Sequence, residues 1–306
     1  MNTSGNLTDP CTPVGPDRQV ASAVVYGLVL VVGLPLNTLS LWILLRSHGF
    51  RSPCAVLMVN LAVSDLLLAL SLPLRVYFYA TLKWPFGAAT CTAAIVLFRV
   101  NIRTSSIFIT LISVDRMVAL VFPLRSRSLR TSACALKCCA VVWILISILC
   151  IPEIIKLYGS LKQCSSESCF EVKAQEKDSV FALSQAIFLL ILLLVNIVST
   201  VVVIITLRKR PSADAAKVNN KMNVILIFVV NMLVFMIFFL PFTLQLLWFN
   251  EKKDRTNIPA VVCLASVNCC LDPLIYYFSL DSFWQDKGKK QTDAGTHSLS
   301  RTMEMS

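Results

Sequence analysis

Seven long apolar segments dominate this chain and limit the folds that are open to it. Each is long enough to cross the roughly 30 Å hydrocarbon core of a bilayer as an α-helix. The alternation of polar and apolar residues that marks membrane β-strands is missing, so an all-α membrane fold is expected. The predicted spans are Val20–Leu45, Cys54–Ala80, Cys91–Leu120, Cys134–Ile155, Val180–Leu207, Met222–Phe249 and Ile258–Leu280.

Composition and charge also indicate an integral membrane protein. Hydrophobic residues make up 56% of the chain and charged residues 15%, whereas soluble domains carry about 25% charged residues. The net charge of +11 could suggest nucleic acid, but the lysines and arginines gather in one set of loops and in the tail. This bias marks the cytoplasmic side and favours contact with anionic membrane lipid over nucleic acid.

The chain divides into three predicted parts. Residues 1–19 form an extracellular segment with glycosylation sequons at Asn2 and Asn6 and no apparent signal peptide. Residues 20–280 form the seven-helix bundle, which places the carboxyl terminus in the cytoplasm. Residues 281–306 form a cytoplasmic tail whose start predicts a short amphipathic eighth helix. Serines in this tail are candidates for phosphorylation and arrestin binding. The expected location is the plasma membrane.

Three arginines lie inside predicted spans, where a charge is costly and usually faces a cavity or a partner. Arg99 and Arg103 are four residues apart on one face of the third span, and Arg75 follows Pro73 in the second. Guanidinium groups bind phosphate or carboxylate through two parallel hydrogen bonds, which suits an anionic ligand. The alternative is that these arginines reach the membrane surface or pair internally, for example with Glu153.

Ordered motifs relate the chain to a known family. They are GLPLN with Asn37, NLAVSD with Asp65, Cys91, Asp115-Arg116, Trp143, FFLPF with Pro241, and DPLIY with Pro273 and Tyr276. Together they resemble the class A, or rhodopsin-like, G-protein-coupled receptors from Val20 to about Trp284. Within that class, segments such as SLPLRVYFYATLKWPFG are most similar to the lysophosphatidic acid receptors, the fifth subtype in particular, which are related to the purinergic nucleotide receptors.

The resemblance implies a ligand site in the extracellular half of the bundle. Arg75 and Arg99 should face the ligand cavity, while Arg103 lies deeper, toward the fourth or fifth span. Tyr79, Phe98 and Trp248 would favour an apolar tail. The implied ligand is a small anionic lipid such as lysophosphatidic acid. A nucleotide or acidic metabolite, or a weakly coupling orphan receptor, is the alternative.

The resemblance also implies an activation apparatus that acts on a heterotrimeric G protein. Arg116 would pair with Asp115 at rest and release when the G protein docks, as the sixth span moves about Pro241. Phe239, Asp272, Pro273 and Tyr276 belong to the same apparatus. The chain departs from the family pattern at Met117, at Leu192 in place of a proline, and at Thr200 in place of a tyrosine. These departures bear on the strength of coupling.

Two further sites are expected. Asp65 with Asn37, Asn268 and Asp272 is a sodium-site candidate, because carboxylate and amide oxygens suit a hard cation. A hydrogen-bonded network without an ion is the alternative. The four cysteines predicted outside the cell allow three pairings, which spacing does not settle. The favoured pairs are Cys91–Cys169 and Cys11–Cys164.

Enzyme and transporter hypotheses have little support. The two histidines, His48 and His297, lie far apart and on the predicted cytoplasmic side, so they complete no catalytic pair with an extracellular nucleophile. Apart from the sodium candidate there is no metal-ligand spacing, and no cofactor is expected. A transporter or anion channel would use intramembrane arginines, but internal repeats are absent and the number of spans is odd.

Overall fold

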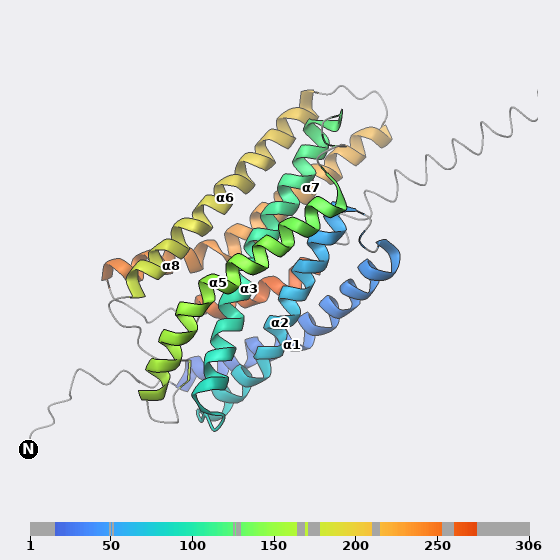
Figure 1. Ribbon diagram of the computed structural model, residues 1–306. Helices are drawn as coiled ribbons and strands as arrows, with labels where there is room; N and C mark the ends of the chain where they lie inside the picture. Colours follow the sequence, from blue (N-terminus) through green and yellow to red (C-terminus); the bar gives the residue numbers. More distant parts are fainter. Residues whose placement is uncertain are drawn as a thin grey trace, which may run out of the picture.

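The computed structural model is an all-α bundle without strands in the residues that it describes. These residues are 16–48, 50, 52–124, 126, 130–163, 169–170, 178–209, 215–252 and 260–273. Figure 1 shows the helices lying alongside one another in a single bundle. Their bounds are α1 Pro16–Ile43, the π-helical turn η1 Leu44–His48, α2 Pro53–Thr81, α3 Gly87–Val121, α5 Ser132–Gln163, α6 Asp178–Lys209, α7 Ala215–Phe238, α8 Leu240–Lys252 and a last helix, Ala260–Pro273.

Among the described residues, six helical stretches are long enough and apolar enough to cross a membrane. Ala260–Pro273 is a shorter apolar helix. The predicted second to fifth spans are confirmed within a few residues, except that α5 continues to Gln163. The predicted eighth helix lies outside the described residues. So do Asn2, Asn6, Cys11, Cys164 and Tyr276, as well as the side chain of Trp248.

Local chemistry sets several helix ends. Ser52 caps α2, because its hydroxyl oxygen accepts a hydrogen bond from the amide of Ala55 at 3.2 Å and Pro53 follows at the first helical position. Gly87 begins α3 with φ of 76°, a conformation that favours glycine. Thr131 caps α5 by accepting a hydrogen bond from the amide of Cys134 at 3.2 Å.

The sixth predicted span is interrupted in the structure. It consists of α7 and α8, which meet at Phe239, two residues before Pro241. A proline has no amide hydrogen and its ring crowds the carbonyl four residues earlier, so a helix kinks just before it. The interruption is a single residue and lies where the hinge is expected; hydrogen bonds from Phe239 to Phe235 and from Thr243 to Phe239 continue across it.

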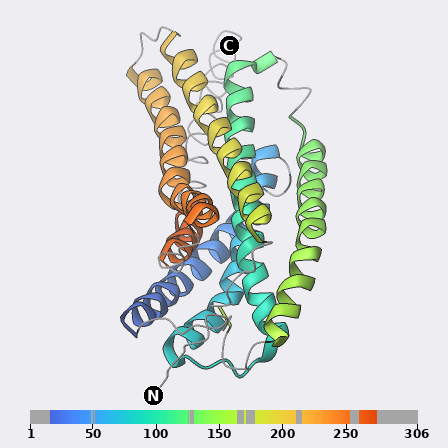
Figure 2. The ribbon, with the colours of Figure 1, turned by 90° about the vertical axis from the view of Figure 1, so that its left-hand side faces the viewer.

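The bundle buries its centre and turns apolar side chains outward. Most of α2 and α3 is buried, whereas most of the residues of α1, α5, α6 and α7 are at least partly exposed. An apolar outer surface of this extent suits lipid rather than water. Figure 2 shows the α2–α3 turn at one end of the bundle and the close of α3 at the other, beside the end of α6 and the start of α7. The buried α3 thus connects the two ends.

Candidate functional site

Arg75 of α2 lies buried among three aromatic rings. Its guanidinium carbon is 4.8 Å from the ring centre of Phe98 in α3, 4.5 Å from that of Phe170 and 5.5 Å from that of Tyr26 in α1. One nitrogen of Arg75 also donates a hydrogen bond to the carbonyl oxygen of Ala94 at 3.5 Å. The ion pairs between described residues do not include Arg75. The charge is thus held by rings and a carbonyl, without a carboxylate.

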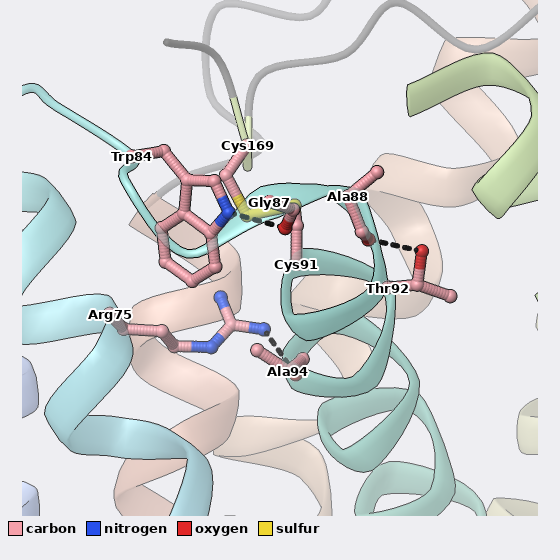
Figure 3. The surroundings of a disulfide bond; sticks show 8 residues. All are labelled: Arg75, Trp84, Gly87, Ala88, Cys91, Thr92, Ala94 and Cys169. Atoms are coloured by element: carbon pink, nitrogen blue, oxygen red, sulfur yellow. Dashed lines mark hydrogen bonds between the residues drawn. A yellow bond between two sulfur atoms is a disulfide. The ribbon is translucent and has the colours of Figure 1, made fainter. Parts of the chain in front are cut away.

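The predicted Cys91–Cys169 disulfide is present and closes this end of the bundle, with 5.6 Å between the Cα atoms. Figure 3 shows it above Arg75, with the indole of Trp84 beside it. The indole nitrogen donates to the carbonyl oxygen of Gly87 at 2.8 Å (Figure 3). Because Phe170 follows Cys169 directly, the disulfide fixes the ring that covers Arg75.

The other aromatic candidates pack around the same group. Tyr79 is buried and stacks on Tyr26 at 5.6 Å and on Phe170 at 6.1 Å between ring centres. Phe98 meets Phe242 of α8 edge-on at 6.4 Å. Tyr79 of α2 and Phe242 of α8 therefore pack behind the rings that contact Arg75.

Arg103 belongs to a different cluster. It is buried and forms a two-pronged ion pair with Glu153 of α5, with Nη1 donating to one carboxylate oxygen at 3.0 Å and Nη2 to the other. Nη2 also donates to the amide oxygen of Gln185 in α6 at 3.1 Å. Arg103 thus joins three helices. The internal pairing expected as an alternative accounts for this arginine.

Arg99 lies one turn above Arg103 and is more open. Its side chain is 40% exposed, and Nη1 lies 3.8 Å from a carboxylate oxygen of Glu153. At that distance and exposure the contact is weak. Glu153 therefore serves two arginines and holds the deeper one more closely.

The sodium-site candidates occupy the middle of the bundle. Asp65 accepts hydrogen bonds from Asn101 at 2.9 Å and from Ser105 at 3.3 Å. Asn268 donates to Asp272 at 2.8 Å, and Asn37 donates to the backbone carbonyl of Cys269 at 2.7 Å. One side-chain oxygen on each of the four candidates is buried without a hydrogen-bond partner among the described residues: Asp65 Oδ2, Asn37 Oδ1, Asn268 Oδ1 and Asp272 Oδ1. These hard oxygen donors fit a small cation.

The opposite end of α3 corrects one expectation. Asp115 pairs with Arg130, the residue before the cap of α5, through hydrogen bonds of 2.7 and 2.6 Å, and not with the neighbouring Arg116. The hydrogen bond to Asp115 is the main reason that the pKa of the Arg130 guanidinium is raised above its usual value. Two parallel bonds satisfy both carboxylate oxygens. Arg116 is therefore left without the aspartate expected to hold it.

Two further residues of the expected activation apparatus, Phe239 and Pro273, are buried. Phe239 is buried at the α7–α8 break and packs against Phe235 with 4.9 Å between ring centres. Pro273 is buried at the end of the described residues, one residue after Asp272. Tyr276, the remaining candidate, lies beyond them.

Comparison with known proteins places the whole arrangement in a family. The model of the 7 transmembrane receptor (rhodopsin family) matches residues 36–276. The chain belongs to this family. The receptor is 37% identical to lysophosphatidic acid receptor 5 of Bos taurus over 85% of its own length and 76% of that protein. It is 34% identical to human lysophosphatidic acid receptor 4, over 91% and 80%, and 30% identical to a putative purinoceptor of Mus musculus, over 85% and 84%.

Membership of this family makes the receptor a multi-pass membrane protein of the signalling class rather than an enzyme. The departures in the fifth span have a structural counterpart. Without a proline, α6 runs unbroken, and Asn196 donates hydrogen bonds to Thr110 of α3 at 2.7 Å and to the carbonyl oxygen of Leu192 at 3.0 Å. Thr200 donates to the carbonyl oxygen of Asn196 at 2.8 Å.

Sequence reasoning missed several residues that the structure adds. Asn101 and Ser105 complete the Asp65 network, and Asn231 of α7 donates to Ser113 of α3 at 2.5 Å. The run of polar residues in the middle of the third span was the available signal, because lipid disfavours them unless they are paired. The partners themselves lie on other helices, so spacing alone does not identify them.

Proposed function

We propose that this receptor responds to a lysophospholipid, with lysophosphatidic acid as the first candidate, and that its phosphate binds Arg75 and Arg99. The observation that carries the proposal is the buried Arg75 guanidinium, which lies among aromatic rings without a carboxylate partner in the described part of the chain. A buried cation is costly unless an anion compensates it. A phosphate oxygen pair would supply that charge in the geometry that guanidinium prefers.

The three arginines have different roles in this proposal. Arg103 is already neutralised by Glu153, so its charge supports the bundle rather than the ligand. Arg99 is 40% exposed and lies one turn nearer the disulfide, with Nη1 3.8 Å from a carboxylate oxygen of Glu153. The rings around Arg75 would pack against the glycerol and the start of the acyl chain. Phe170 covers Arg75 and would have to shift for the phosphate to reach it.

The names of the relatives support this order of candidates. Several of the similar proteins are lysophosphatidic acid receptors, while one at 30% identity is named a purinoceptor. A nucleotide would present the same phosphate to the same arginines, but it has no long apolar chain. The aromatic surroundings of Arg75 therefore favour the lipid.

A ligand panel with a matched variant tests the proposal. Lysophospholipids, nucleotides and acidic metabolites are applied to cells that express wild-type receptor or Arg99→Ala, and G-protein activation is recorded together with surface expression. We expect lysophosphatidic acid to activate the wild type, and Arg99→Ala to reach the surface but lose the response. Activation by a nucleotide alone, or equal potency in the variant, would sink the lipid assignment.

We also propose that the disulfide end faces outward at the plasma membrane. Disulfides persist in oxidising surroundings, and the Cys91–Cys169 bond closes this end. The opposite end carries Arg130 and the free thiol of Cys134. Lysines and arginines in short loops favour the cytoplasm. An amino-terminal epitope tag should be stained by antibody on intact cells.

At the inner end we propose that Arg116 is the residue that meets the G protein. Arg130 holds Asp115 through both oxygens, so Arg116 is not held by its neighbour. The Nε atom of Arg116 is buried without a hydrogen-bond partner among the described residues, and a docking helix would supply one. Movement about the break before Pro241 would open the groove for that helix. Arrestin, after phosphorylation of tail serines, is a further proposed partner.

If Arg116 contacts the G protein, then replacing it should abolish signalling without affecting folding. Arg116→Ala should reach the surface and bind agonist but activate no G protein, as measured by nucleotide exchange on purified G protein. Arg46→Ala serves as the control, because Arg46 is an exposed arginine whose charge lies over the Trp42 ring, 5.5 Å from its centre. Full exchange activity with Arg116→Ala would refute the role.

A sodium ion is proposed for the centre of the bundle. Asp65 and Asp272 would supply carboxylate oxygens, and Asn37 and Asn268 would supply amide oxygens, because each has a buried oxygen without a partner among the described residues. A bound cation would compensate the two acidic groups and favour the resting arrangement. These residues would hold the ion while the ligand site lies closer to the disulfide.

A further inference from the structure

The first two turns of α5 carry three cysteines whose surroundings differ. Cys134 is exposed, Cys138 is partly exposed, and Cys139 is buried. Cys134 and Cys138 are four residues apart, so they lie on one face of the helix, about 6 Å apart along its axis. Of the free cysteines that the structure describes, Cys134 is the exposed one. This face therefore presents two accessible thiols at the start of a membrane-spanning helix.

These thiols lie at the edge of the membrane. α5 begins at Ser132, directly after its cap Thr131, and the membrane-spanning stretch begins at the same residue. The exposed Lys137 lies three residues after Cys134, where its basic side chain can meet anionic headgroups. The α2–α3 turn lies at the opposite end of the bundle from the start of α5 (Figure 2), and Cys91, near the start of α3, is bonded to Cys169. With the orientation proposed above, both thiols face the cytoplasm, where thiols stay reduced.

An apolar track continues from Cys138 along the outside of α5. Val141, Leu145 and Leu149 follow it at three, seven and eleven residues, so they lie on the same helical face. Each is more than half exposed. The next charged residue along the helix, Glu153, is buried and turned toward Arg103. A hydrocarbon chain attached at this face could lie against these side chains within the lipid.

We propose that Cys134 and Cys138 form a site for fatty acylation through a thioester. The donor is a long-chain acyl-coenzyme A, used by a membrane-bound acyltransferase. The cysteine sulfur attacks the acyl carbonyl carbon, a new carbon–sulfur bond forms, and the bond to coenzyme A breaks. Coenzyme A leaves with the proton of the cysteine thiol, so no oxidant or reductant is needed. Hydrolysis of the thioester restores the thiol, which makes the modification reversible.

The modified cysteines would lie close in sequence to the proposed G-protein contact end of the receptor. Cys134 lies four residues after Arg130, the partner of Asp115. An acyl chain inserted in the bilayer would hold the start of α5 at the membrane surface. It would thereby restrain the segment that carries Arg130. The printed sequence has no cysteine after Cys270, so this helix end, rather than the tail residues given, would carry the lipid.

Metabolic labelling tests the site without using the ligand. Cells expressing the receptor with an amino-terminal tag receive an alkyne analogue of palmitate, and the purified receptor is coupled to a fluorophore. The wild type should be labelled, and hydroxylamine, which cleaves thioesters, should remove the label. Cys134→Ala/Cys138→Ala should lose the label, whereas Cys139→Ala should keep it because Cys139 is buried. The single variants show how the label is divided between the two cysteines.

The inference rests on the proposed orientation and not on the proposed ligand, and antibody staining of the tag on intact cells separates these failures. Surface staining of every variant shows that it has folded and reached the membrane. Label that persists in Cys134→Ala/Cys138→Ala, or a wild-type receptor at the surface that takes up none, would overturn the site. Label lost only in Cys139→Ala would overturn it as well.

Discussion

Replacing Glu153 with glutamine should destabilise the receptor by about 3–5 kcal/mol, the usual cost of leaving one member of a buried ion pair alone. Glu153 and Arg103 are both buried, and both carboxylate oxygens accept hydrogen bonds from the guanidinium. Gln185 supplies no charge that could replace the carboxylate. Arg99, 3.8 Å from Glu153, would lose its neighbour as well. Most of the variant is therefore expected to be retained inside the cell.

A double variant separates the unpaired charge from a general loss of packing. Arg103→Met/Glu153→Leu removes both charges and keeps apolar volume, and such replacements are often neutral or stabilising. It should recover surface expression and thermal stability in detergent, measured on the purified protein. Lys162→Gln, at an exposed position in the last turn of the same helix, should behave like the wild type. A double variant as unstable as Glu153→Gln would show that the pair is not the cause.

The helices of this receptor could be predicted because their signal is local. A run of apolar residues long enough for the bilayer needs no knowledge of its neighbours. The break at Phe239 could also be expected from Pro241, since proline acts on its own helix. The helix ends could be predicted less closely: α5 passes Pro152 and continues to Gln163, because turns beyond the hydrocarbon can stay helical without apolar side chains.

The sequence indicated candidate residues for the site, but several of their contacts could not be predicted from it. Asp115 and Arg130 are 15 residues apart, and the adjacent Arg116 was the nearer candidate in sequence. Arg75 is enclosed by Tyr26 of α1 and by Phe170, which the Cys91–Cys169 bond brings over it. Contacts of this kind depend on how helices pack, and no periodicity within one span encodes them.

The Arg103–Glu153 pair is a second contact that the sequence could not settle. Sequence alone left Arg103 as either a ligand contact or an internal partner of Glu153, because both residues lie within spans. The distance between them decides for the internal pair. Arg75 is then the buried arginine whose charge has no carboxylate partner among the described residues. The ligand hypothesis therefore depends mainly on this residue of α2.

Replacing Arg75 with methionine should lower agonist potency by roughly one to two orders of magnitude, because hydrogen bonds to a charged group contribute about 1.5–3 kcal/mol. The methionine keeps the apolar stem and its contacts with the rings of Phe98 and Phe170, so the fold should be retained. Removing a buried charge that has no carboxylate partner should leave thermal stability unchanged or raise it. Potency is thus expected to fall without a loss of thermal stability.

Two comparisons make this result specific. Arg75→Lys keeps the charge but loses the fork that grips two phosphate oxygens, so its potency should fall between those of wild type and Arg75→Met. Arg46→Met makes the same substitution at an arginine that also lies over a ring, that of Trp42, and its potency should not change. Concentration–response curves for lysophosphatidic acid, matched for surface expression, provide the measurement. If Arg75→Met loses stability together with potency, then Arg75 acts as a structural residue; if potency is unchanged, then the phosphate binds elsewhere.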